Sequence, residues 1–218
     1  NKTFQNTLKQ ILFFVIPFSI LFIILRVQIV RVVLGAGKFD WQDTVLTANS
    51  LGFFCMSLFA QALLPLLARA FYARHNTMVP FAAAFVSLIT NVFLSWWLIG
   101  EMGVLGLALG FSISSIVNLV ILVAFLVRDV KGIVKNGILK SLAKVSFAAL
   151  VMGVVTQYVK TWLGHTVDMQ SFVGILTQGF VAGIVGVLIF ALISYWLKTE
   201  EFLSFLGSLK KKLLKKKF

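Results

Sequence analysis

The sequence predicts an all-α, polytopic transmembrane helix bundle with six membrane-spanning helices and both ends in the cytoplasm. Two properties of the composition carry this prediction: 60% of the 218 residues are hydrophobic, and only 12% are charged. The third observation is that the apolar residues gather in six stretches of about 20 residues, the length that a helix needs to cross a hydrocarbon core of about 30 Å. A helix satisfies its own backbone N–H and C=O groups, so its apolar side chains can face lipid.

The six apolar stretches follow one another along most of the chain. They cover roughly residues 11–34, 44–68, 79–99, 104–127, 142–160 and 172–197. The first contains Pro17 and the second Pro65, and a proline inside a helix removes a backbone hydrogen bond and can kink the segment. Glycines spaced three or four residues apart in the fourth and sixth stretches predict close helix packing.

Basic residues predict the orientation of these helices. Sixteen of the 20 Lys and Arg residues fall at the N-terminus, in loops 69–78 and 128–144, and in the C-terminal tail. The remaining four are Arg26, Arg31, Lys38 and Lys160. The positive-inside rule then places the larger set and both termini in the cytoplasm. The net charge of +13 is explained by loop retention and anionic lipid, so no nucleic-acid partner is expected.

Two basic segments are expected to lie on the cytoplasmic face. Residues 128–144 form a linker with an apolar stripe surrounded by lysines. Residues 199–218 form a tail in which apolar residues recur at helical spacing before a lysine run, the pattern of an amphipathic helix in a membrane interface. We expect the tail to bind anionic lipids, at about 1 kcal/mol for each basic residue near the surface.

Arg26 is the most informative residue inside a predicted span. It lies about 12 Å from the outer end of its helix, counted at about 1.5 Å per residue. A guanidinium there costs about 2.5–10 kcal/mol unless it snorkels, pairs or faces water. Two interpretations remain open: a water-filled cavity that binds an anion, since the planar fork of arginine suits phosphate, or a structural pair with Glu101 or Asp40. Arg31 can snorkel, which favours an interfacial anchor.

Polar side chains recur on the next three predicted helices. Each of them alone fits a hydrogen bond between helices worth about 0.6 kcal/mol. Together they indicate that the first four helices surround something polar. The candidate substrate-binding residues of this cavity are Arg26, Gln28, Arg31, Asn49, Asn91 and Asn118.

The sequence lacks the motifs of an enzyme. His75 and His165 fall on opposite sides of the predicted membrane, no pair of carboxylates shares a helical face, and no glycine-rich phosphate loop precedes a lysine. The single cysteine, Cys55, excludes an internal disulfide and a thiolate metal site. We therefore expect no enzymatic activity, no metal and no cofactor, and transport energy that comes from a gradient, a potential or downstream consumption.

Two motifs point to a known family. The first is Ile16-Pro17 followed by residues 25–40, with a Gly-x-Phe pattern over 37–39, and then by Asp43 and Thr47-Ala48. The second is R-x-F-Y-A-x-x-N-T-x-x-P over residues 69–80. At this spacing they resemble the MurJ/MviN lipid II flippases of the multidrug/oligosaccharidyl-lipid/polysaccharide exporter superfamily. The motif residues are Gly37, Phe39, Arg69, Phe71, Tyr72, Arg74, Thr77 and Pro80. The motifs support the resemblance over residues 8–128, and the rest matches in hydropathy.

The resemblance implies a fold of fourteen helices, in which two six-helix lobes precede two additional helices. This chain would then hold helices nine to fourteen. Residues 1–127 would be the second half of the C-terminal lobe, 128–144 the linker, 145–198 the two additional helices and 199–218 the tail. Because the chain begins with Asn1 rather than Met, we expect it to be the trailing part of a larger protein, whose N-terminal lobe would be its partner.

The resemblance also implies a function. A lipid-linked disaccharide-pentapeptide would be carried from the inner to the outer leaflet of the bacterial cytoplasmic membrane by alternating access. Arg26 and Arg31 match the pattern of the ninth helix and are cavity candidates only. The alternatives are an exporter of another polyprenyl-linked polysaccharide unit and a non-transporting membrane scaffold for cell-wall synthesis. A costly arginine within the membrane argues against the scaffold.

Overall fold

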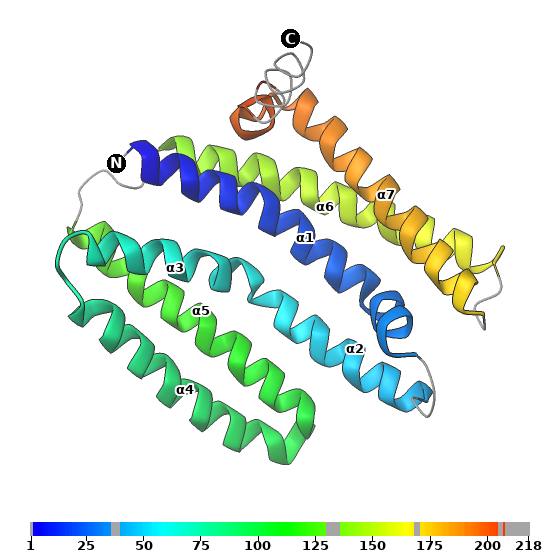
Figure 1. Ribbon diagram of the computed structural model, residues 1–218, viewed down its shortest axis with the longest axis horizontal. Helices are drawn as coiled ribbons and strands as arrows, with labels where there is room; N and C mark the ends of the chain where they lie inside the picture. Colours follow the sequence, from blue (N-terminus) through cyan, green and yellow to red (C-terminus); the bar gives the residue numbers. More distant parts are fainter. Residues whose placement is uncertain (1, 36–39, 130–135, 168–170, 205–206, 208–218) are drawn as a thin grey trace, which may run out of the picture.

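The computed structural model describes residues 2–35, 40–129, 136–167, 171–204 and 207, and the regular elements in these ranges are all α-helices. In chain order they are α1 (Lys2–Leu34), α2 (Trp41–Met56), α3 (Leu58–Tyr72), α4 (Met78–Met102), α5 (Val104–Asp129), α6 (Asn136–Gly164) and α7 (Phe172–Trp196) (Figure 1). A further helical turn over residues 200–204 follows α7. The all-α prediction is confirmed.

The six predicted spans correspond to these seven helices. Five helices, α1, α4, α5, α6 and α7, are each long and apolar enough to cross a membrane. The remaining span, the second along the chain, consists of α2 and α3, which meet at Ser57 with an angle of 41°. The span predicted over 44–68 is therefore present and is broken into two helices. The break falls at Ser57 and not at Pro65, which lies inside α3.

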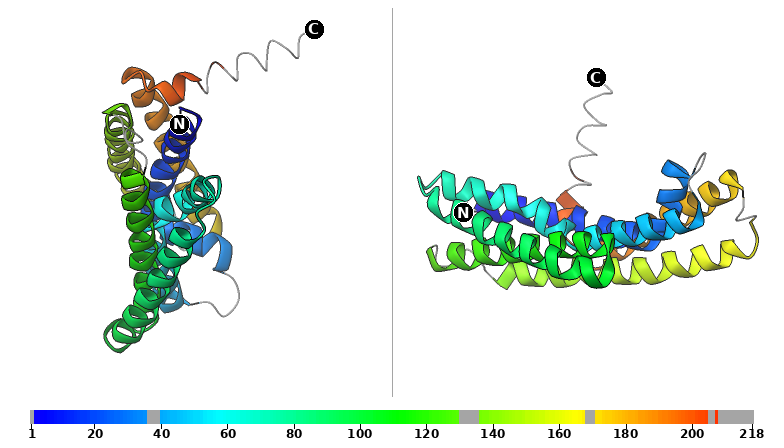
Figure 2. Two further views of the ribbon diagram at one scale, coloured as in Figure 1. Left: turned by 90° about the vertical axis from the view of Figure 1, so that its left-hand side faces the viewer. Right: turned by 90° about the horizontal axis from the view of Figure 1, so that it is seen from below.

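The helix α1 lies in the middle of the bundle. On one side it packs against α6 and α7, and on the other side against the α2–α3 span (Figure 1). That span separates α1 from α5, and α4 packs on the outside of α5. Viewed at right angles, the helices form a layer that is thin compared with its length (Figure 2).

Two apolar cores hold the layer together, and α1 contributes to both. The first joins α1, α3, α4 and α5 through Leu12, Ala60, Leu63, Leu67, Phe71, Ala83, Leu119, Leu122 and Leu126. The second joins α1, α6 and α7 through Phe13, Leu21, Leu25, Val145, Ala148, Ala149, Met152, Ala182 and Phe190. Neighbouring residues such as Leu12 and Phe13 serve different cores because successive helical residues point about 100° apart.

Glycines allow the closest helix contacts, as their spacing predicts. A Cβ atom added to Gly106 would lie 2.5 Å from the carbonyl oxygen of Leu98, so α4 and α5 approach each other backbone to backbone. A Cβ atom on Gly110 would lie 2.9 Å from Ser95 Oγ. A Cβ atom on Gly186 would run into Thr156 Oγ1 between α6 and α7. Small residues at helix interfaces are typical of membrane bundles.

The outer surface of the bundle is apolar. In the most apolar 18-residue segment of α4, only 11% is buried within the described structure. Phe81, Phe85 and Trp96 on this helix are 69%, 54% and 76% exposed. A helix that is hydrophobic all round belongs in a protein core or in lipid. The chain is therefore a multi-pass membrane protein; its orientation remains the prediction from charge.

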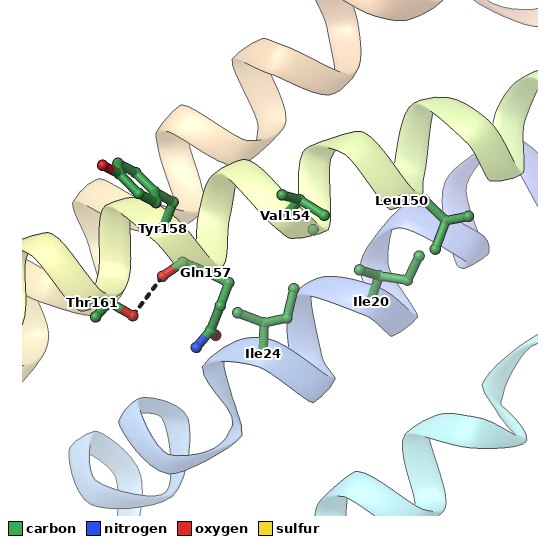
Figure 3. Close-up of a pocket in the computed structure, with 8 residues that line it drawn as sticks. Ile20, Ile24, Leu150, Val154, Gln157, Tyr158 and Thr161 are labelled. Carbon is green, nitrogen blue, oxygen red and sulfur yellow. Dashed lines mark hydrogen bonds between the residues drawn. The ribbon is translucent and has the colours of Figure 1, made fainter.

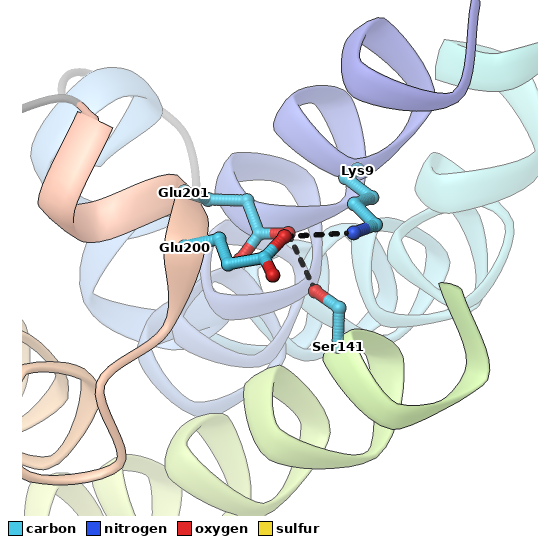
Figure 4. Close-up of polar contacts among 4 residues, drawn as sticks. All are labelled: Lys9, Ser141, Glu200 and Glu201. Atoms are coloured by element: carbon cyan, nitrogen blue, oxygen red, sulfur yellow. Dashed lines mark hydrogen bonds and ion pairs between the residues drawn. The ribbon is translucent and has the colours of Figure 1, made fainter. Parts of the chain in front are cut away.

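A polar cluster joins the start of α1, the start of α6 and the turn after α7 (Figure 4). Lys9 Nζ pairs with Glu200 Oε2 at 3.0 Å, and Ser141 Oγ donates to Glu201 Oε1 at 2.6 Å. This is the end of the bundle that the charge pattern places in the cytoplasm. Where the predicted linker 128–144 is described, it forms the end of α5 and the beginning of α6. The lysine run of the tail lies outside the described residues.

Candidate functional site

The candidate residues of α1 face different neighbours. Arg26 and Gln28 are two positions apart, so their side chains leave the helix about 200° apart. Arg26 lies against α2, whereas Gln28 bonds with α7. Both residues are among the six cavity candidates from the sequence, and the structure places them on two faces of α1.

Arg26 lies across a glycine of α2. A Cβ atom added to Gly52 would lie 3.0 Å from Arg26 Nη1 and 3.3 Å from its Cδ, so the absence of a side chain there makes room for the arginine. Arg26 is half-buried. The ion pairs among the described residues are Lys9–Glu200 and Arg74–Asp129. The structural pair of Arg26 with Glu101 or Asp40 is therefore not formed in this part of the chain.

Asp40 caps the N-terminus of α2. Its side chain accepts a hydrogen bond from Asp43 N at 2.8 Å, and Asp43 Oδ2 accepts one from Asp40 N at 3.3 Å. This reciprocal capping box satisfies two free N–H groups at the start of α2 and is typical of helix N-termini. The carboxylates closest in sequence to the arginines of α1 are thus used to begin the next helix.

Gln28 belongs to a buried lock between α1, α6 and α7. Gln28 Nε2 donates to Gln178 Oε1 at 2.7 Å, and Gln178 Nε2 donates to the carbonyl oxygen of Lys160 at 2.7 Å. Lys160 Nζ donates to the carbonyl oxygen of Ile24 at 2.9 Å. Both glutamines are buried, and Gln28 Oε1 has no partner among the described residues. We call Gln28, Lys160 and Gln178 the polar lock.

Sequence reasoning missed two members of the polar lock. Lys160 was counted as an outer-loop charge because the predicted span ended there, but α6 continues to Gly164. Gln178 is one of few polar residues in a long apolar stretch, and this signal could have identified it. A polar side chain in a span is expensive unless it has a partner.

Arg31 lies at the end of α1. Its guanidinium carbon lies 5.6 Å from the ring centroid of Trp41, a cation–π contact worth about 0.5–1 kcal/mol at an exposed site. Arg31 is half-buried and its Nε has no partner among the described residues. The contact ties α1 to the start of α2.

The three candidate asparagines are spread over the bundle. Asn49 lies on α2, one turn before Gly52, so it is on the side of α2 that approaches Arg26. Asn91 lies on α4 and Asn118 on α5, which the α2–α3 span separates from α1. All three are half-buried, and Asn118 Oδ1 has no partner among the described residues. Of the three, Asn49 is the one whose helix packs closely against α1.

The second family motif forms the turn between α3 and α4. Phe71 is fully buried, and its carbonyl oxygen accepts a hydrogen bond from Asn76 N. Between them, His75 has a φ of 54°, which turns the chain. Asn76 Oδ1 then accepts from Val79 N at the start of α4. Pro80 is buried in the first turn, where a proline is tolerated. These contacts make the motif a helix-to-helix turn.

The charged and polar members of that motif point outwards. Arg74 Nη1 pairs with Asp129 Oδ2 at 3.5 Å and so joins the turn to the end of α5. Arg69, Tyr72 and Thr77 are exposed. Gly37 and Phe39, which belong to the first motif, lie outside the described residues.

An apolar groove of about 560 Å³ lies between α1 and α6 (Figure 3). Its apolar part is formed by residues such as Ile20, Leu150 and Val154, and its polar end by Gln157 and Thr161. None of the six candidate cavity residues lines this groove. Among the described residues, no group of three or more His, Cys, Asp or Glu could hold a metal ion.

The chain is similar to known proteins over most of its length. Residues 1–178 match the family model described as lipid II flippase MurJ. Over 201 residues the chain is 29% identical to the probable lipid II flippase MurJ of Thermotoga maritima, which covers 92% of this chain and 39% of that protein. The lipid II flippase MurJ of Thermosipho africanus is 30% identical over 152 residues, or 70% of this chain and 30% of that protein.

The fold is similar to a solved structure as well. A lipid II flippase MurJ in an inward closed conformation matches with a TM-score of 0.73 at 26% identity, over 91% of this chain and 39% of that one. These matches cover most of this chain but only about two fifths of the length of the matched proteins.

Proposed function

Because the chain belongs to the lipid II flippase MurJ family, we propose that it forms the C-terminal portion of such a flippase in the bacterial cytoplasmic membrane. The intact protein would move an undecaprenyl-diphosphate-linked peptidoglycan precursor from the inner to the outer leaflet by alternating access. Residues 1–127 would complete the second lobe, the 128–144 linker would connect it to two additional helices over 145–198, and an N-terminal lobe of the same protein would be its partner.

Arg26 is the residue that we assign to the substrate cavity. The observation that supports this role is its position: it lies in a membrane span, on Gly52, without a carboxylate partner among the described residues. A half-buried guanidinium without an acidic partner favours an anion, and the diphosphate of a lipid-linked precursor is one. Asn49 is the second residue of this face, and Arg31 holds the outer end of α1.

The remaining parts of the proposal concern the cytoplasmic side. The tail over 199–218 would bind anionic lipids through its lysines, at about 1 kcal/mol for each basic residue near the surface. Both termini would be cytoplasmic, as the distribution of Lys and Arg indicates. No enzymatic step, cofactor or nucleic acid is part of the proposed function.

Complementation tests the proposal. The intact protein is expressed in a bacterium depleted of its own lipid II flippase, and growth is followed. We expect rescue by the wild type and loss of rescue by Arg26→Ala at an unchanged membrane level. Arg26→Lys keeps the charge without the planar fork, so it should rescue partly. Arg128→Ala removes an exposed arginine and serves as the matched control.

The outcomes test the identity of the transported lipid and the role of Arg26 separately. An intact wild type that reaches the membrane and fails to rescue would contradict lipid II as the cargo and favour another polyprenyl-linked unit. Full rescue by Arg26→Ala would contradict the role of Arg26 and leave the family function in place.

A further inference from the structure

The break in the second span is surrounded by hydrogen-bonded side chains. Gln61 Nε2 donates to Ser57 Oγ at 2.8 Å, and Ser112 Oγ donates to the carbonyl oxygen of Phe53 at 2.7 Å. The single hydroxyl hydrogen of Ser57 has two acceptors within reach, Ser112 Oγ and the carbonyl oxygen of Phe54, each at 3.1 Å. Ser57 is 0% and Ser112 2% exposed. We call these three side chains and the Phe53 carbonyl the hydroxyl relay.

The relay ends on a carbonyl group that the break has released. In an unbroken α-helix the oxygen of residue 53 accepts from the N–H of residue 57. Here Ser57 N donates to Phe54 O instead, at 3.1 Å. Ser112, on α5, supplies the missing donor to Phe53. This replacement matters because an unsatisfied carbonyl group in the hydrocarbon region is costly.

Nothing in the covalent backbone at Ser57 enforces the bend. Sharp helix kinks usually come from a proline, a glycine or an inserted side chain or water. There is neither a proline nor a glycine at Met56, Ser57 or Leu58. Pro65 lies eight positions further on, inside α3. The same residues could therefore continue as a straight helix, in which Ser57 N–H would bond with Phe53 O.

We propose that the α2–α3 span is a two-state hinge at Ser57. In the bent state the Phe53 carbonyl accepts from Ser112, and in the straight state it accepts from Ser57 N–H and Ser112 is released. Each state satisfies the same carbonyl group, so the two exchange one hydrogen bond for another. Hinges of this kind absorb a large rotation in a few backbone dihedrals.

The hinge moves the half of the span that carries Gly52. Gln42 lies fifteen residues before Ser57, so removing the 41° bend would displace it by about 16 Å at about 1.5 Å per residue. Gly52 is the residue on which Arg26 lies, so the movement would change the space around that arginine. This last consequence rests on the proposed function, whereas the hinge itself does not.

A distance measurement tests the hinge. Nitroxide labels are placed at the exposed positions Gln42 and Glu101 of the intact protein, with Cys55→Ala, in lipid nanodiscs, and pulsed EPR gives the distance distribution. Ser112→Ala removes a donor that only the bent state uses. We expect it to add a second population, shifted by several ångström, that the wild type holds at a lower level. Ser112→Thr retains a hydroxyl and should restore the wild-type distribution.

The matched control is Ser115→Ala. Ser115 is a buried serine of the same helix, and its Oγ donates to Phe111 O within α5 at 2.9 Å. Its distribution should equal that of the wild type. Identical distributions for Ser112→Ala and Ser115→Ala would overturn the hinge.

A second variant covers failure of Ser112→Ala to fold. Gln61→Leu removes the other end of the relay, and a shifted population there supports the hinge while an unchanged distribution overturns it. Because distance is measured and not transport, a failed hinge is distinguishable from a failed flippase assignment.

Discussion

The two sides of α1 differ in how the bundle uses buried polar groups. Towards α6 and α7, the polar lock of Gln28, Lys160 and Gln178 connects three unbroken helices. Beyond α1 on the other side, the hydroxyl relay of Gln61, Ser57 and Ser112 surrounds a break in the second span. Both sets lie among apolar side chains and use neutral donors or a single amine.

The difference is whether a backbone hydrogen bond is missing. In the polar lock, Gln178 and Lys160 donate to carbonyl groups of intact helices, so their bonds add to a complete backbone and fasten the helices together. In the relay, Ser112 replaces a lost backbone bond of Phe53, so the backbone has an alternative partner. Similar chemistry therefore predicts rigidity on one side of α1 and two conformations on the other.

The largest effect is expected where the rigid side is most tightly packed. Gly186→Ala would drive a Cβ atom into Thr156 Oγ1, with Leu21 Cδ2 only 3.1 Å away. Overpacking of this kind costs about 1–3 kcal/mol, and we expect the free energy of unfolding, measured by steric trapping in bicelles, to fall by that amount.

Gly183→Ala is the control for Gly186→Ala, one turn earlier on α7. Its Cβ atom would lie 3.4 Å from Leu25 Cδ1, an ordinary contact. The helix propensity of alanine then dominates, and stability should stay equal or rise by up to about 1 kcal/mol. Equal losses at the two glycines would contradict the close α6–α7 packing at Gly186.

A smaller loss is expected when the polar lock itself is opened. Gln178→Leu leaves the buried amide of Gln28 without its partner, and interhelical hydrogen bonds in membranes are worth about 0.6 kcal/mol on average with losses of about 1–3 kcal/mol for orphaned buried groups. We expect the free energy of unfolding to fall by about 1 kcal/mol. The double variant Gln28→Leu with Gln178→Leu should recover most of this, because no orphaned amide remains.

The polar lock and the hinge should behave independently. In Gln178→Leu, the Gln42–Glu101 distance distribution should equal that of the wild type, because the lock joins α1 to α6 and α7 only. A shifted distribution in this variant would mean that the two sides of α1 are coupled, and the contrast between rigid lock and hinge would be wrong.

Hydropathy was sufficient to predict the spans, because lipid leaves a chain few other choices than apolar helices. The position of Arg26 in such a span also identified it as unusual from sequence alone. The break at Ser57 could not be predicted in this way. Serine is a weak helix breaker, and the group that stabilises the break, Ser112, lies 55 residues away.

The candidate site was predicted less well than the fold. Gln28 was grouped with Arg26 because they are close in sequence, but its partner Gln178 lies 150 residues away on α7. Asn91 and Asn118 were grouped with them as polar residues, without information on which helices are neighbours. A single sequence gives the cost of a polar group in a span, and the packing decides which partner meets that cost.

The smallest effect on stability is expected at Gly52, the residue of α2 that Arg26 contacts. In Gly52→Ala the new Cβ atom would lie 3.0 Å from Arg26 Nη1, the far end of a long side chain that can move away. The helix propensity of alanine, up to about 1 kcal/mol better than that of glycine, offsets the cost of moving the arginine, so the free energy of unfolding should change by less than about 0.5 kcal/mol.

The displaced guanidinium should nevertheless affect transport. We expect growth rescue by Gly52→Ala to fall between that of the wild type and that of Arg26→Ala, while Gly183→Ala, the same substitution on α7, rescues fully. Full rescue by Gly52→Ala together with loss of rescue by Arg26→Ala would mean that Arg26 acts independently of its contact with α2. In that case a movement of α2 at Ser57 would have no route to the arginine through Gly52, and hinge and site would have to be treated as separate features.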